Sequence, residues 1–181
     1  STHSASFHSE ISLSFSTDKG TTWSDYYPVV KSQPEQQRDY RNQCLGQSQD
    51  GHLILVYGSI PVGDPLTPQP MFAMRSSDDG STYSPPTPIS PPTNTWLNPH
   101  GQMRRLPNGT LILNARGGYL PEAYQQNPNL PERISCLYHS SDNGNTWHML
   151  SELGNDASET GILPINNDHW IGYVRHNNRP N

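Results

Sequence analysis

The chain has 181 residues, with 11 Lys and Arg against 16 Asp and Glu and a formal net charge of −5. This length allows one domain or a part of a larger one, and the sequence has no basic stripe that would bind nucleic acid through its charge. The longest apolar run, Leu53–Tyr57, is far shorter than the roughly 20 residues that cross a bilayer, so we expect no membrane span.

Only 31% of the residues are hydrophobic, yet 4 Trp, 9 Tyr and regularly spaced apolar runs argue against disorder. Gly and Pro number 14 and 18, a density that leaves little room for long helices. No targeting segment is visible at Ser1–Ser4, and we expect a processed or truncated chain.

The apolar runs predict strands throughout the chain, several of them joined by Asp-Gly or Asn-Gly, which are strong hairpin-turn signals. In chain order the predicted strands are Ile11–Ser16, a strand after Trp23, Arg41–Gly46, Leu53–Tyr57, Met71–Arg75, a strand after Tyr83, Gly101–Leu106, Leu111–Leu113, Ile134–His139, a strand after Trp147, Glu159–Leu163 and Trp170–Val174. The predicted hairpin turns are at Asp50-Gly51, Asn108-Gly109 and Asn167-Asp168.

An octapeptide pattern, S-x-D-x-G-x-T-[WY], occurs three times at near-constant spacing: Ser16–Trp23, Ser76–Tyr83 and Ser140–Trp147. Each Asp can accept backbone N–H bonds from the turn that follows, each Gly supplies a positive φ, and each aromatic ring can fill the space between neighbouring sheets. We therefore predict structural roles for Asp18, Gly20, Trp23, Asp78, Gly80, Tyr83, Asp142, Gly144 and Trp147.

One repeat of about 60 residues amounts to a four-stranded antiparallel sheet, the blade of a β-propeller. The predicted fold class is all-β, with the end of one blade in residues 1–30, a second blade in 38–90, a third in 98–153 and the start of a fourth in 157–181. Two half-blades would leave sheet edges open, so either further blades of a longer chain or a second copy are expected to complete the ring.

These boxes resemble the Asp boxes of the sialidase (neuraminidase) superfamily, six-bladed propellers that remove terminal sialic acid. Three further segments are similar to parts of the family's third and fourth blades: Asn98–Met103, Ser135–Ser140 and Ser158–Leu163. A fourth such segment is Tyr173–Arg175. The resemblance covers nearly the whole chain and implies that it contains the family's second to fourth blades.

The resemblance implies that Glu159 is the base that takes a proton from a Tyr nucleophile outside this chain, and that Arg175 binds the substrate carboxylate. A guanidinium suits that role because it pairs with a carboxylate through two hydrogen bonds. The implied partner is a sialylated glycan. The family's acid Asp, its Tyr and two of its three arginines have no assigned match here; Arg41 and Asp64 are interpreted as repeat-equivalent positions of the second blade.

First strands and the loops after them face the axis of a propeller, so Arg41, Arg116 and Tyr119 are expected to line a central pocket, with plain surface positions as the alternative. No cofactor or metal is expected, because the eight His show no metal-ligand spacing. Cys44 and Cys136 are expected to be unpaired, half-buried thiols, although one disulfide bond stays open.

Asn108-Gly109-Thr110 fits both a hairpin turn and an N-glycosylation sequon, and the sequon would accompany an extracellular, secreted protein. The leading functional interpretation is a sialidase-like glycoside hydrolase. The alternative is a non-catalytic carbohydrate-binding or structural propeller, since an Asp box stabilises a turn whatever the reaction. The sequence leaves open which glycosidic linkage is preferred, whether the sugar is released to water or transferred to another sugar, and whether the chain takes part in catalysis at all.

Overall fold

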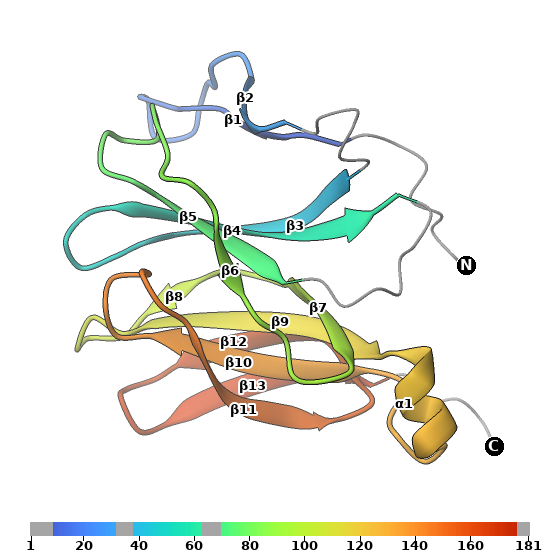
Figure 1. The fold of residues 1–181 in the computed structure, drawn as a ribbon. Coiled ribbons are helices and arrows are strands. Elements are labelled where there is room, and N and C mark those ends of the chain that lie inside the picture. Colours follow the sequence, from blue (N-terminus) through green and yellow to red (C-terminus); the bar gives the residue numbers. More distant parts are fainter. Residues whose placement is uncertain (1–8, 32–37, 63–69, 177–181) are drawn as a thin grey trace.

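The computed structural model describes residues 9–31, 38–62 and 70–176, which form four antiparallel sheets stacked in chain order (Figure 1). The first sheet pairs β1 (Ile11–Leu13) with β2 (Tyr27–Val30), and the fourth pairs β12 (Ala157–Pro164) with β13 (Trp170–His176). The second has the order β3 (Arg38–Gln47), β4 (Leu53–Pro61), β5 (Met71–Ser76) and β6 (Thr87–Ile89). The all-β prediction is confirmed.

The third sheet has the order β11 (His148–Asn155), β10 (Ile134–Ser140), β9 (Leu111–Tyr119) and β7 (Thr95–Pro99), with β8 (Arg104–Arg105) also paired to β9. One short helix, α1 (Pro121–Gln126), follows β9 and begins with a proline, a residue that suits the first helical turn. The predicted strand Gly101–Leu106 is wrong in its extent. The strand that pairs with β9 at the end of this sheet is β7, which lies earlier in the chain. Gly101, with φ of 77°, separates β7 from β8.

The predicted hairpin turns join neighbouring strands. Gly51 and Gly109 have φ of 89° and 88°, a region that glycine enters without steric cost. Ser48 and His52 close the first turn, and Leu106 and Thr110 close the second, each through a backbone hydrogen bond of 2.8–2.9 Å. Both turns connect a strand to the next strand of the same sheet, which confirms the turn role of Asn108-Gly109.

The three Asp boxes have the same internal hydrogen bonds. In the first, the Thr22 backbone N–H donates to Asp18 Oδ1 at 2.9 Å, the Thr22 hydroxyl donates to Asp18 Oδ2 at 2.6 Å, and the Gly20 N–H donates to Ser16 Oγ at 2.8 Å. The corresponding distances in the second and third boxes are identical. The predicted role of the aspartate is confirmed.

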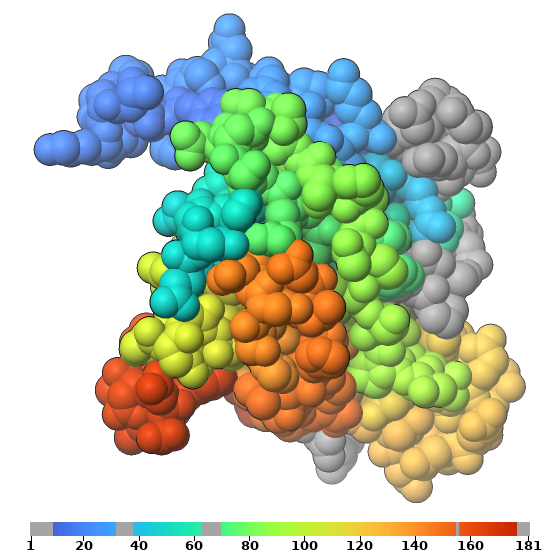
Figure 2. All heavy atoms as spheres, turned by 60° about the vertical axis from the view of Figure 1, so that its left-hand side comes forward, coloured from blue at the N-terminus to red at the C-terminus, as the bar shows by residue number. Residues whose placement is uncertain are grey.

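Each box turns through two residues of positive φ, the pattern of a type I′ turn. The first of the two is Lys19, Asp79 or Asn143, with φ between 56° and 62°, and the second is the box glycine, with φ between 82° and 87°. All three boxes lie on the side of the sheet stack that Figure 2 brings forward from the left of Figure 1.

The core consists of apolar layers between successive sheets rather than one central cluster. The layer between the second and third sheets is the largest and includes Ile54, Val56, Leu111 and Leu113, all fully buried. Smaller layers separate the first sheet from the second and the third from the fourth. Face-to-face burial of this kind positions each sheet against the next and thereby positions the strand ends that carry the polar side chains.

The box aromatics occupy these layers only in part. Tyr83 packs between the first and second sheets, and Trp147 packs between the second and third. Trp23 is 65% exposed, and no sheet among the described residues lies beyond the first, so its predicted packing role is not tested. Tyr83 and Trp147 each fill the gap toward the preceding sheet.

Cys44 and Cys136 are unpaired, as expected, but they are buried rather than half-buried. Both lie in the layer between the second and third sheets, and the Cys44 thiol donates to the Gly101 carbonyl oxygen. Burial raises the pKa of Cys44 to about 11 and that of Cys136 to about 12. Thiols held neutral in this way are poor nucleophiles.

In the described parts of the chain, no helix has the length and apolar character needed to cross a membrane.

Candidate functional site

Glu159 and Arg175 meet on paired strands of the fourth sheet. Thr160 of β12 lies opposite Val174 of β13, and the register is irregular between Ala157 and Thr160. Arg175 Nη1 donates to Glu159 Oε2 at 2.8 Å. The side chains are 41% exposed for Glu159 and 62% exposed for Arg175, so solvent reaches both. The structure therefore brings together the two residues that the family resemblance singled out.

The electrostatic surroundings favour the ionised form of Glu159. The hydrogen bond from Arg175 lowers the pKa of the carboxyl, slight burial opposes this, and the charges of Arg175, Arg116 and, when it is protonated at low pH, His100 lower it further. Glu159 is therefore a carboxylate at neutral pH and can accept a proton.

Arg116 approaches Glu159 from the third sheet. It lies in β9 opposite Asn98 of β7, and side chains alternate along a strand, so it shares a face with Asn114. The Asn114 amide donates to the Thr160 carbonyl oxygen at 2.6 Å, which shows that this face is directed toward β12. Arg116 Nε is buried and has no hydrogen-bond partner within the described residues.

His100 is a site residue that the sequence reasoning missed. Its backbone N–H donates to the Asn114 carbonyl oxygen at 2.8 Å, which extends the pairing of β7 with β9 by one residue. Burial lowers the pKa of His100, Arg116 lowers it further, and Glu159 opposes them. The imidazole is therefore neutral at neutral pH. Its position in the Asn98–Met103 segment was the available signal.

Arg41 binds a carboxylate of its own chain. Its guanidinium Nε and Nη2 contact Asp39, two residues earlier in β3. Asp39 is buried and also accepts a hydrogen bond from the Ser9 hydroxyl, so Arg41 balances a buried negative charge. Asp64 lies outside the described residues.

Tyr119 is on the other face of the third sheet from Arg116. Its ring packs against the layer between the second and third sheets and meets the Tyr124 ring edge-on, with centroids 6.3 Å apart. The structure thus does not bring Tyr119, Arg41 and Arg116 into one pocket.

A hollow of about 360 Å³ lies at the junction of the third and fourth sheets, next to the Glu159–Arg175 pair. Its polar lining comes from His100, Gln102, Arg104, Asn114, Thr160 and Tyr173. Thr160 directly follows Glu159, and Tyr173 stands two residues before Arg175 on the same strand. Within the described residues, no group of three or more His, Cys, Asp or Glu side chains is arranged to hold a metal ion.

Stacked antiparallel sheets of about four strands, linked by repeated Asp boxes, define a β-propeller architecture. Residues 7–180 match the model of the BNR repeat-like domain, and the chain belongs to this family. No curated protein sequence matches the chain.

Three solved structures illustrate the likeness. The Hadza microbial sialidase Hz136 has a TM-score of 0.77 and 19% identity, over 93% of this chain and 36% of its own. A protein of unknown function from Dyadobacter fermentans has a TM-score of 0.69 and 18% identity, over 92% of this chain and 51% of its own. The α-L-arabinanase of Penicillium chrysogenum, complexed with arabinobiose, has a TM-score of 0.57 and 19% identity, over 75% of this chain and 40% of its own.

At these identities the likeness establishes a shared fold. The chain spans between about a third and a half of the length of these proteins. The predicted resemblance to sialidase-type propellers is confirmed at this level.

Proposed function

We propose that the chain contributes to a sialidase-like glycoside hydrolase that removes terminal sialic acid from glycoconjugates. Glu159 serves as the base for a Tyr nucleophile supplied from outside this chain, and Arg175 binds the substrate carboxylate. The observation that carries the proposal is the 2.8 Å contact between these two side chains on paired, solvent-accessible strand ends.

Arg175 has donors to spare for an anionic substrate. A guanidinium carries five N–H donors, and the hydrogen bond to Glu159 uses one of them. A substrate carboxylate can therefore bind the remaining donors without breaking the pair. Arg116, with its unpartnered Nε, adds positive charge on the side of the third sheet.

Glu159 has the protonation state that a base requires. A carboxylate that is ionised at neutral pH can take the phenolic proton and make the Tyr oxygen nucleophilic. An attacking Tyr approaches an anionic sugar without the charge repulsion that an attacking carboxylate would meet. We infer an extracellular location from this substrate, and the exposed turn at Asn108 is compatible with glycosylation there.

The likeness to the arabinanase supports a second candidate, a glycosidase that acts on neutral arabinose-containing sugars. In that case Arg175 would only orient Glu159, because the substrate has no carboxylate to bind. A non-catalytic, sugar-binding propeller is the third candidate.

The test is hydrolysis of a fluorogenic sialoside by the product of the complete gene, with an arabinofuranoside in parallel. We expect sialoside turnover, a loss of kcat of about a hundredfold or more in Glu159→Gln, and a raised KM in Arg175→Lys with a smaller change in kcat. Glu152→Gln, at an exposed carboxylate of the third sheet, is the matched control and should leave both constants unchanged.

Full sialoside turnover in Glu159→Gln would overturn the assigned role. Turnover of the arabinofuranoside alone would favour the second candidate, and binding of either sugar without turnover would favour the third.

A further inference from the structure

A second hollow, of about 640 Å³, lies between the second and third sheets on the side of the Asp boxes. Its lining comes from the β3–β4 turn, the end of β5, the second box with β6, and the third box. Both flanking sheets have their four strands within this chain, so the hollow is shaped by this chain alone. None of its lining residues belongs to the fourth sheet, which carries Glu159 and Arg175. Its volume is within the range of small-molecule sites.

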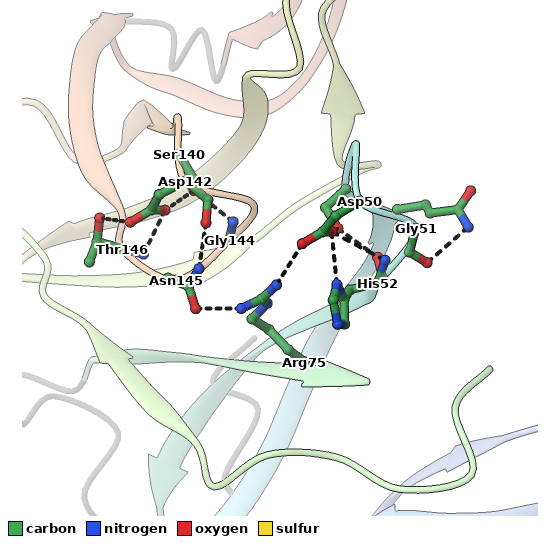
Figure 3. Close-up of polar contacts among 11 residues, drawn as sticks. Asp50, Gly51, His52, Arg75, Ser140, Asp142, Gly144, Asn145 and Thr146 are labelled. Carbon is green, nitrogen blue, oxygen red and sulfur yellow. Dashed lines mark hydrogen bonds and ion pairs between the residues drawn. The ribbon is translucent and has the colours of Figure 1, made fainter. Parts of the chain in front are cut away.

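Arg75 lines this hollow. Its guanidinium lies between Asp50 and Asn145 and is held from both sides (Figure 3). Its Nη2 donates to Asp50 Oδ2 at 3.2 Å, and its Nη1 donates to Asn145 Oδ1. The Asn145 amide in turn donates to the Asp142 carbonyl oxygen, which ties the guanidinium to the third box. Arg75 Nε is buried and has no hydrogen-bond partner in the part of the chain that the structure describes.

The positive charge of Arg75 is paired with the negative charge of Asp50. Asp50 contacts Arg75 and also His52, whose Nδ1 lies 2.8 Å from Asp50 Oδ1. The hydrogen bond from Ser48, followed by that from His52, lowers the pKa of Asp50 well below its ordinary value, so the carboxylate stays ionised. The guanidinium of Arg75 is thus paired with a carboxylate, and both of its terminal nitrogens already donate within the protein.

The remaining polar groups are mainly hydroxyls. The lining includes Ser77, Thr82, Ser84 and Thr87. Ser77 and Thr87 are exposed, and within the described residues their hydroxyls form no hydrogen bond. A hydroxyl both donates and accepts, which matches the hydroxyls of a sugar.

We propose that this hollow is a binding site for neutral carbohydrate, separate from the Glu159–Arg175 site. The free hydroxyls of Ser77 and Thr87 bind the sugar hydroxyls at the rim. Arg75, held in place by Asp50 and Asn145, adds a fixed polar group to the lining of the site. An anionic group on the sugar gains little here, because both terminal nitrogens of Arg75 already donate to Asp50 and Asn145.

The test is a titration of the isotope-labelled chain by two-dimensional NMR, with lactose, maltose and arabinobiose as neutral probes. The sialylated form of lactose is the charged counterpart. We expect saturable shifts of the amides around Ser77, Thr87 and Asn145 with at least one neutral sugar, and no tighter binding of sialyllactose than of lactose. An absence of saturable shifts at the hollow with all three neutral sugars would overturn the proposal, as would a clear preference for the sialylated form.

Two matched variants locate the binding. Ser77→Trp places a large ring at the rim and should weaken binding by about tenfold or more. Thr17→Trp makes the same change at the equivalent exposed position of the first box, which does not line the hollow, and should leave the Kd unchanged. Equal Kd values for the two variants would contradict the assignment. Glu159→Gln should also bind normally, which separates this result from the fate of the proposed hydrolase activity.

Discussion

The first and third Asp boxes have the same internal geometry in very different surroundings. Their three defining hydrogen bonds agree in length, and both turn through two residues of positive φ. Gly20 is exposed, whereas Gly144 is buried against Ile54 of the second sheet. Trp23 is mostly exposed, whereas Trp147 packs in the largest apolar layer.

This difference shows which properties of the motif are local and which are tertiary. The turn forms from bonds within eight residues, so it is the same wherever the motif occurs. The contribution of the aromatic ring and of the glycine to stability depends on the neighbouring sheet. A structural motif with one sequence pattern therefore makes unequal contributions to stability at its different copies.

The largest difference in stability is expected between two variants that each remove one tryptophan. Trp147→Ala leaves a void between the second and third sheets and should lower the free energy of unfolding by about 3 kcal/mol. Trp23→Ala truncates a residue that is 65% exposed and should change the free energy of unfolding by no more than about 0.5 kcal/mol. Urea unfolding of the two variants and the parent chain measures both values. Equal losses would show that the ring acts within its own box.

A smaller difference is expected between the two glycines. Gly20→Ala and Gly144→Ala both force a side chain into positive φ, which costs about 1–2 kcal/mol. At position 144 the new Cβ would also lie 2.9 Å from Ile54 Cδ1, and Ile54 is fully buried and cannot move away easily. At position 20 the nearest atom is in the Trp23 ring at 3.9 Å.

Gly144→Ala should therefore be less stable than Gly20→Ala by a further 1–2 kcal/mol or so, measured again by urea unfolding. If the two variants were equally stable, the contact with Ile54 would be loose enough to adapt. Gly51→Ala, where φ is also positive and no atom lies within 4 Å of the new Cβ, supplies the cost of the backbone conformation alone.

Most of the fold could be predicted because its signals are local. Apolar runs, Asp-Gly and Asn-Gly turns and the three boxes each act over a few residues, and they located most of the strands in the four sheets. The start of the third sheet was misplaced because Thr95–Pro99 contains Pro99 and Asn98, which weaken a strand pattern, and because Gly101 breaks the strand after it.

The candidate site could be predicted only where its residues follow one another on a hairpin. Glu159 and Arg175 belong to adjacent strands, so their meeting follows from one turn. His100 joins them from another sheet, and the pairing of Arg41 with buried Asp39 depends on packing that a sequence pattern does not encode. Tyr119 and Arg116 are separated by the alternation of side chains along β9, with odd positions toward the second sheet and even positions toward the fourth.

The smallest difference is expected between the aspartates of the first two boxes, because their bonds are local. Hydrogen bonds from the Thr22 side chain and backbone lower the pKa of Asp18 from 3.8 to about 2, and those from Thr82 do the same for Asp78. A folded-state pKa below the unfolded value means that the unfolded chain binds the proton first. The stabilisation is therefore present above about pH 4 and is lost as the pH falls toward 2.

NMR titration of the side-chain carboxyl groups should give the same pKa, near 2, for Asp18 and Asp78, although only the second box is covered by a neighbouring sheet. Asp79→Asn is the control, since it removes the adjacent carboxylate and introduces the residue found at the equivalent position of the third box, Asn143. It should leave the Asp78 titration in place, whereas Thr82→Val should move it back toward 3.8, because the hydroxyl that donates to Asp78 is lost. If Asp18 titrated near its ordinary value while Asp78 did not, the turn itself would depend on the neighbouring sheet, and the division between local and tertiary properties of the box would fail.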